Sequence, residues 1–103
     1  MPDDDLIKRL EAIRDRLERV ATGPAGGAGS PAYAAYVQAR ELVMAARIKQ
    51  LHANQQLYTD ALKKIADAEG VIARADKQIG WAATVINDIA KALSEAETII
   101  TKM

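Results

Sequence analysis

The chain has 103 residues, half of them apolar, with one Trp, three Tyr, no Phe and no Cys. Its 14 basic and 14 acidic side chains cancel, so no overall charge attracts nucleic acid or an anionic membrane, and we expect no nucleic acid as a partner. The length suits a single domain, and the absence of Cys excludes a disulfide framework and a thiolate metal site.

Residues 1–22 are predicted to form an amphipathic helix that begins in the acidic segment Asp3–Asp5. An Asp at a helix start can accept hydrogen bonds from the free N–H groups of the first turn, and it interacts favourably with the positive end of the helix dipole. Apolar residues then recur every three or four positions, which places them on one face. We expect this face to dock on the rest of the protein or on another subunit through Leu6, Leu10, Ile13, Leu17 and Val20.

The acidic start has no apolar segment behind a basic stretch, so we expect no cleavable signal peptide. No uninterrupted apolar run approaches the roughly 18 residues of a membrane-spanning helix, so no transmembrane segment is expected. The cytoplasm and export by a signal-independent route both fit these features, and the sequence leaves the compartment unknown.

Residues 23–31 are rich in glycine and proline, which interrupt regular helix, and are predicted to be a flexible linker. Ser30 and Pro31 at its end form a helix start signal. Ser accepts a hydrogen bond at the N-cap, and Pro fits the first helical position, whose N–H is unpaired. Residues 32–103 are therefore predicted to be a second helical region.

A large apolar side chain occupies every seventh position of this region, a period typical of helices that wrap around other helices. The residues of this series are Val37, Met44, Leu51, Tyr58, Ile65, Ile72, Ile79, Ile86, Leu93 and Ile100. Three residues after a member of this series, the chain mostly carries small or apolar residues, namely Ala61, Ala68, Ala75, Ala82, Ile89 and Ala96. We name these sixteen residues the heptad seam and predict that it is an assembly surface.

Two architectures satisfy this pattern. Pro31 to Met103 as one helix would be about 108 Å long, at about 1.5 Å per residue, and would be stable only against other copies. Alternatively, the chain turns near residues 52–54, at Gly70 or at Gly80, and packs as a helical hairpin or compact bundle. We favour the long helix, because turns usually shift the phase of an apolar pattern and this pattern passes every candidate turn unshifted. The predicted fold class is all-α, in an oligomeric coiled coil or helical bundle.

We find no pattern that points to catalysis, a cofactor or a metal. His52 is the only histidine, and Gln55 and Gln56 occupy the helical positions where a second metal ligand would be expected. Paired carboxylates occur only where we expect solvent, whereas acid–base catalysis needs a desolvated pocket. The chain is therefore predicted not to be an enzyme.

Five other side chains suggest packing rather than chemistry. We expect Trp81 to anchor an interface or core, and Tyr33 and Tyr36 to receive the first helix or a second subunit. Arg40 and Arg47 lie on the seam side, and we expect their charged ends to extend to the surface.

The leading hypothesis is a structural, self-assembling protein whose copies associate through the heptad seam as a homo-oligomer. A short helix, a Gly/Pro loop and a long helix form a layout that resembles small filament or needle subunits and phage structural proteins, without a diagnostic motif. The alternative is a small helical-bundle adaptor or regulator that binds a helix of another protein. The two hypotheses differ in how the particle mass depends on protein concentration. The mass of a self-assembling protein rises with concentration, whereas that of a monomeric adaptor stays constant.

Overall fold

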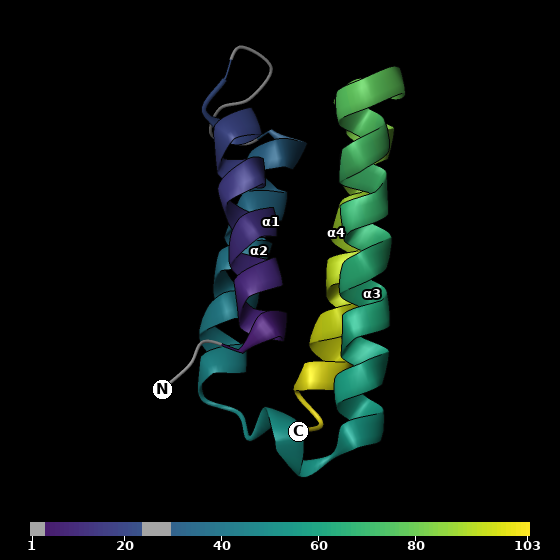
Figure 1. Ribbon diagram of the computed structural model, residues 1–103. Coiled ribbons are helices and arrows are strands. Elements are labelled where there is room, and N and C mark those ends of the chain that lie inside the picture. The colour runs from purple at the N-terminus through teal and green to yellow at the C-terminus, as the bar shows by residue number, and fades with distance from the viewer. Residues whose placement is uncertain (1–3, 24–29) are drawn as a thin grey trace.

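The computed structural model describes residues 4–23 and 30–103, without the side chains of Gln78 and Ile79. These residues form an all-helical bundle with a short 3₁₀ turn at Leu51–Ala53 and a π-helical turn at Ala75–Ile79. Its four α-helices are α1 (Asp5–Ala21), α2 (Pro31–Arg47), α3 (Gln55–Arg74) and α4 (Ala83–Ile100). The helices run alternately up and down, with α1 beside α2 and α3 beside α4 (Figure 1). The bundle measures 41 × 23 × 23 Å.

The predicted long helix is wrong, because the chain reverses direction twice between Pro31 and Met103. The first reversal follows α2, and it ends where the Asn54 side chain accepts a hydrogen bond from the Leu57 N–H at 3.1 Å and caps α3. The second lies at Gly80, whose φ of 73° is a left-handed conformation that glycine adopts without steric cost. Gly70, the other candidate turn, lies inside α3.

Two predicted helix starts are confirmed. The carboxylate of Asp4 caps α1 by accepting a hydrogen bond from the Leu6 N–H at 2.8 Å. The hydroxyl of Ser30 caps α2 by accepting one from the Tyr33 N–H at 3.1 Å, and Pro31 takes the first helical position. The linker prediction falls mostly on residues 24–29, which lie outside the described part of the chain.

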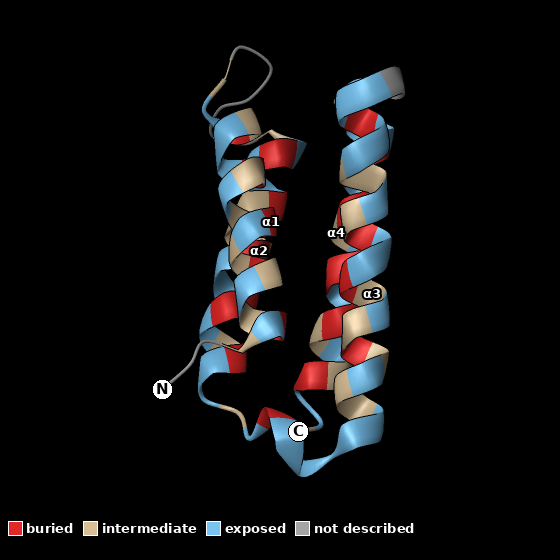
Figure 2. Cartoon of the chain, viewed as in Figure 1, coloured by how far each residue is buried: buried red, intermediate tan, exposed pale blue. Residues whose placement is uncertain are grey.

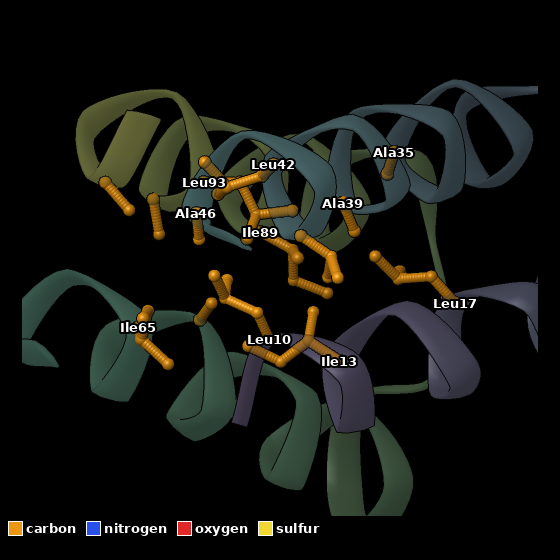
Figure 3. Packing of buried hydrophobic residues seen from close by; sticks show 14 of the residues in the cluster. Leu10, Ile13, Leu17, Ala35, Ala39, Leu42, Ala46, Ile65, Ile89 and Leu93 are labelled. Atoms are coloured by element: carbon orange, nitrogen blue, oxygen red, sulfur yellow. The ribbon is translucent and has the colours of Figure 1, made fainter. Parts of the chain in front are cut away.

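The core is formed by apolar residues from all four α-helices. Figure 2 shows the buried positions in red along each helix. Leu10 of α1, Ala39 of α2, Ile65 of α3 and Ile89 of α4 all belong to it and are fully buried (Figure 3). The contribution of α2 consists mainly of alanines, whose small side chains allow neighbouring helices to approach closely. The apolar core is thus closed within one copy of the chain.

Candidate interaction surface

Helix α2 carries two apolar faces. The inward face belongs to the core and consists of Ala32, Ala35, Ala39, Leu42, Val43 and Ala46. The outward face consists of Tyr33, Val37 and Met44, together with the C-cap residue Ile48. At about 100° per residue, these four side chains fall within about 60° of one another, on the side opposite the inward face. We name them the α2 outer stripe.

The α2 outer stripe is accessible to solvent. Tyr33 is 41% exposed, Met44 60% and Ile48 82%, while Val37 is half-buried. Within the described part of the chain, the exposed large apolar side chains are Tyr33, Met44 and Ile48, and all three lie on this face. A single exposed apolar residue is ordinary, whereas a row of them on one face is typical of an interaction site.

Charged and aromatic side chains surround the stripe. The Tyr33 and Tyr36 rings pack edge to face with centroids 6.1 Å apart, and the Arg40 guanidinium lies 5.6 Å from the centre of the Tyr36 ring. Arg40 and the neighbouring Glu41 are both exposed, and neither forms an ion pair with another described residue. Arg47 also reaches the surface, as expected, where it pairs with Glu11 of α1.

The heptad seam is divided between the core and the surface. Its buried members all follow α2, and they are Leu51, Ala61, Ile65, Ala68, Ala75, Ile86, Ile89, Leu93, Ala96 and Ile100. Tyr58 and Ile72 are half-buried, Ala82 is exposed, and the Ile79 side chain lies outside the description. Val37 and Met44 instead face outward, because α2 turns its alanines to the core. The expectation that the apolar phase continues unshifted through the first turn is therefore wrong.

The docking face predicted for the first helix lies against the rest of the bundle. Leu6, Leu10, Ile13 and Leu17 are buried and Val20 is half-buried. Ion pairs at the edges of this contact join α1 to the other helices. The Arg9 Nε donates to Glu69 of α3 at 3.1 Å, and the Arg16 Nε donates to Asp76 at 3.3 Å.

Trp81 lies half-buried against the core at the turn between α3 and α4. Its indole N–H donates to the Asp76 carboxylate at 3.1 Å, and the Arg16 guanidinium lies 5.2 Å from the ring centre. The hydrogen bonds from Arg16 and Trp81 together hold the pKa of Asp76 below its usual value, against a smaller opposing effect of burial. Trp81 therefore ties this turn to α1.

A polar cluster lies at the end of the bundle where α1 begins. The Asp4 carboxylate pairs with His52 and accepts a hydrogen bond from the Tyr58 hydroxyl at 2.9 Å. Partial burial raises the pKa of Asp4, but the hydrogen bonds from Tyr58, the Leu6 N–H and His52 outweigh it, so the pKa lies below its ordinary value. A carboxylate held ionised in this way is a weak base, and its position fits a structural tie between α1 and the 3₁₀ turn.

Asp4, His52 and Tyr58 also line an open groove of about 770 Å³, whose other acidic, basic and apolar side chains come from α1, the end of α2 and the first turn. Within residues 4–23 and 30–103, no three His, Cys, Asp or Glu side chains come together in an arrangement that would hold a metal ion. None of the described helices is long and apolar enough to cross a membrane. Of the surfaces described, the α2 outer stripe is the one where exposed large apolar side chains gather.

The CAP N-terminal conserved motif matches residues 4–35. The match includes α1 and the first turn of α2, but it ends before Val37, Met44 and Ile48. It covers less than half of the chain, so it is a similarity of the N-terminal part. The comparisons with curated proteins and with solved structures give no match.

Proposed function

We propose that this protein is a self-associating helical bundle that works by protein–protein contact through the α2 outer stripe. The observation that carries the proposal is that α2 places a second row of large apolar side chains on the surface, opposite the face that forms the core. The proposal includes no catalytic step and no cofactor. It assigns the protein a structural role, as the subunit of a larger assembly such as a filament, needle or phage-type structure.

The apolar side chains of the stripe favour coverage by a partner. Complete burial of a Met or Ile side chain contributes about 1.5–3 kcal/mol relative to the exposed state. Because Met44 and Ile48 retain most of their exposed surface, most of this contribution is still available in the isolated bundle. A partner can cover these side chains without opening the core, because they take no part in it.

A second candidate function is an adaptor that binds an amphipathic helix of another protein. The observation that favours it is that the core of the bundle is closed within one copy. A chain with a complete core can act as a monomer, and the α2 outer stripe can take the apolar face of a foreign helix.

Sedimentation velocity over a wide range of protein concentration tests the primary proposal. The average mass of the wild-type chain is expected to rise above 11.1 kDa as concentration increases. Met44→Asp should keep the monomer mass and the wild-type circular dichroism spectrum, since Met44 is exposed. Ala66→Asp, on the exposed side of α3, is the matched control and should associate like the wild type. A wild-type chain that stays at the monomer mass throughout would overturn self-association in favour of the adaptor.

A further inference from the structure

We propose that Met44 is a site of reversible oxidation, and that its conversion to methionine sulfoxide abolishes association through the α2 outer stripe. The oxidant is a peroxide, and the modified atom is the sulfur of the Met44 side chain. This inference rests on the proposed function and adds a chemical regulation of the same surface.

The first support is the accessibility of Met44. The chain contains three methionines and no cysteine, so thioethers are its only sulfur groups. Met44 is 60% exposed, whereas Met103 is half-buried against the core, and Met1 lies outside the described residues. A peroxide must reach the sulfur atom, so an exposed methionine is oxidised faster than a buried one. Of the two described methionines, Met44 should therefore react first.

The reaction is the transfer of one oxygen atom. The sulfur of Met44 attacks one oxygen of hydrogen peroxide, an S–O bond forms and the O–O bond breaks. The other oxygen takes the proton of the transferred oxygen and leaves as water, so sulfur loses two electrons and the peroxide gains them. A methionine sulfoxide reductase reverses the step. A dithiol supplies the two electrons, the oxygen leaves as water and the thioether is restored.

The second support is the position of Met44 within the stripe, between Val37 and Ile48. Oxidation turns its flexible apolar side chain into a polar one. The sulfoxide oxygen accepts hydrogen bonds, so covering it with an apolar partner removes its water without replacing those bonds. Loss of the apolar contact of Met44 alone should weaken association by about tenfold, and desolvation of the sulfoxide weakens it further.

The third support is Arg40, which lies one helical turn before Met44 and is therefore its neighbour on the helix surface. Arg40 is exposed and forms no ion pair with another described residue. Its guanidinium N–H groups can donate to the sulfoxide oxygen, which stabilises the oxidised side chain in the isolated bundle. Because Met44 takes no part in the core, the oxidised bundle should stay folded.

Treatment of the full chain with hydrogen peroxide tests this assignment. Mass spectrometry of its peptides should show that Met44 is oxidised faster than Met103. In sedimentation velocity, the chain oxidised at Met44 should stay at the monomer mass at concentrations where the untreated chain associates, with an unchanged circular dichroism spectrum. Incubation of the oxidised chain with a methionine sulfoxide reductase and a dithiol should restore association.

Met44→Leu is the matched control, because Leu is apolar, has a similar volume and carries no sulfur. This variant should associate like the wild type both before and after treatment with peroxide. It retains Met1 and Met103, so any effect of their oxidation on association would still be seen in it.

The outcomes separate the regulation from the proposed function. The assignment of Met44 is wrong if Met103 reacts as fast, if the chain oxidised at Met44 associates like the untreated chain, or if peroxide also abolishes association of Met44→Leu. In each of these cases, self-association of the untreated chain and its loss in Met44→Asp would still support the association surface. If the untreated chain is monomeric at every concentration, self-association and its regulation fail together.

Discussion

Truncation of Leu93 and truncation of Met44 should have very different effects on stability, although both residues belong to the heptad seam. Leu93 is fully buried among the side chains of the core, whereas Met44 is 60% exposed. In an assembly of long parallel helices, the two positions would be equivalent, and both truncations would weaken the same seam. In the bundle, only one of them opens a cavity.

The size of the difference follows from burial. Leu93→Ala removes apolar groups from a closed core and leaves a cavity, which lowers the free energy of unfolding by about 3 kcal/mol, within the range of about 2–5 kcal/mol for such changes. The same loss lowers the melting temperature by roughly 10–20 °C in a domain of about 100 residues. Met44→Ala removes side-chain atoms that are already largely in water, and should cost less than about 1 kcal/mol.

Urea unfolding followed by circular dichroism measures both losses. Leu93→Ala is made in the wild-type and in the Met44→Asp background, and Met44→Ala in the wild type alone. Each curve is recorded at two protein concentrations about tenfold apart, so that any association is detected. Leu93→Ala in the Met44→Asp background should show an unfolding midpoint that does not depend on concentration. The reasoning is refuted if Met44→Ala destabilises the wild type as much as Leu93→Ala does, or if the Leu93→Ala loss disappears on dilution.

Three further predictions concern Asp4, Asp76 and the glycines Gly70 and Gly80. Asp4→Ala should lower the free energy of unfolding by about 1–2 kcal/mol, because it removes the cap of α1 and leaves Tyr58 without its acceptor, whereas Asp5→Ala should cost less in the same urea experiment. The lowered pKa values of Asp4 and Asp76 contribute stability that is present above the unfolded-state pKa of about 3.9 and is lost as pH falls through the folded-state pKa values. Acid unfolding should therefore be less steep in the variant in which both residues are replaced by Asn. An identical acid transition in the wild type and this variant would contradict the prediction. Gly80→Ala should lower the free energy of unfolding by about 1–2 kcal/mol, because Gly80 has a positive φ. Gly70→Ala, with open space around the added methyl group, should raise the free energy of unfolding by up to about 1 kcal/mol. Melting curves that rank the two variants the other way would be inconsistent with the second turn.

Local signals in the sequence are sufficient to predict the two helix starts and the first helix. The caps at Asp4 and Ser30 and the apolar face of α1 depend on residues within a few positions of each other, and such patterns can be read along the chain. The turn sites were also among the candidates, since Asn54 and Gly80 are weak helix formers. Whether the chain turns at these residues depends on the apolar surface that the flanking helices bury. The chain turns there if the helices bury more surface packed against each other than in one continuous helix, and local sequence patterns do not show this.

The heptad pattern predicts the wrong buried face for α2, because the pattern depends on large side chains whereas the core face of α2 consists mainly of alanines. Ala35 and Ala39 form the core face of α2, while the larger Val37 and Met44 lie outside it. Close packing of helices selects small residues at the contact, so the largest apolar residues of a helix need not mark its buried face. After Leu51 the large residues and the core face coincide, and there the seam positions are mostly buried.

Contacts between distant parts of the chain could not be predicted from the sequence. Asp4 meets His52 and Tyr58 only because α1 begins at the same end of the bundle as the 3₁₀ turn and α3. Arg16 and Trp81 meet for a similar reason, at the turn between α3 and α4. No spacing or motif relates such residues until the order and direction of the helices are known.

The most direct test of the account is a dilution series of two-dimensional amide NMR spectra of the wild-type chain. If α2 carries the working surface, concentration-dependent shifts should cluster at residues 33–48 and be absent from the outer faces of α3 and α4. Met44→Asp should remove these shifts and leave the remaining spectrum folded and unchanged. Shifts that appear instead along α3 or α4, or that persist in Met44→Asp, would contradict the assignment of the α2 outer stripe as the association surface.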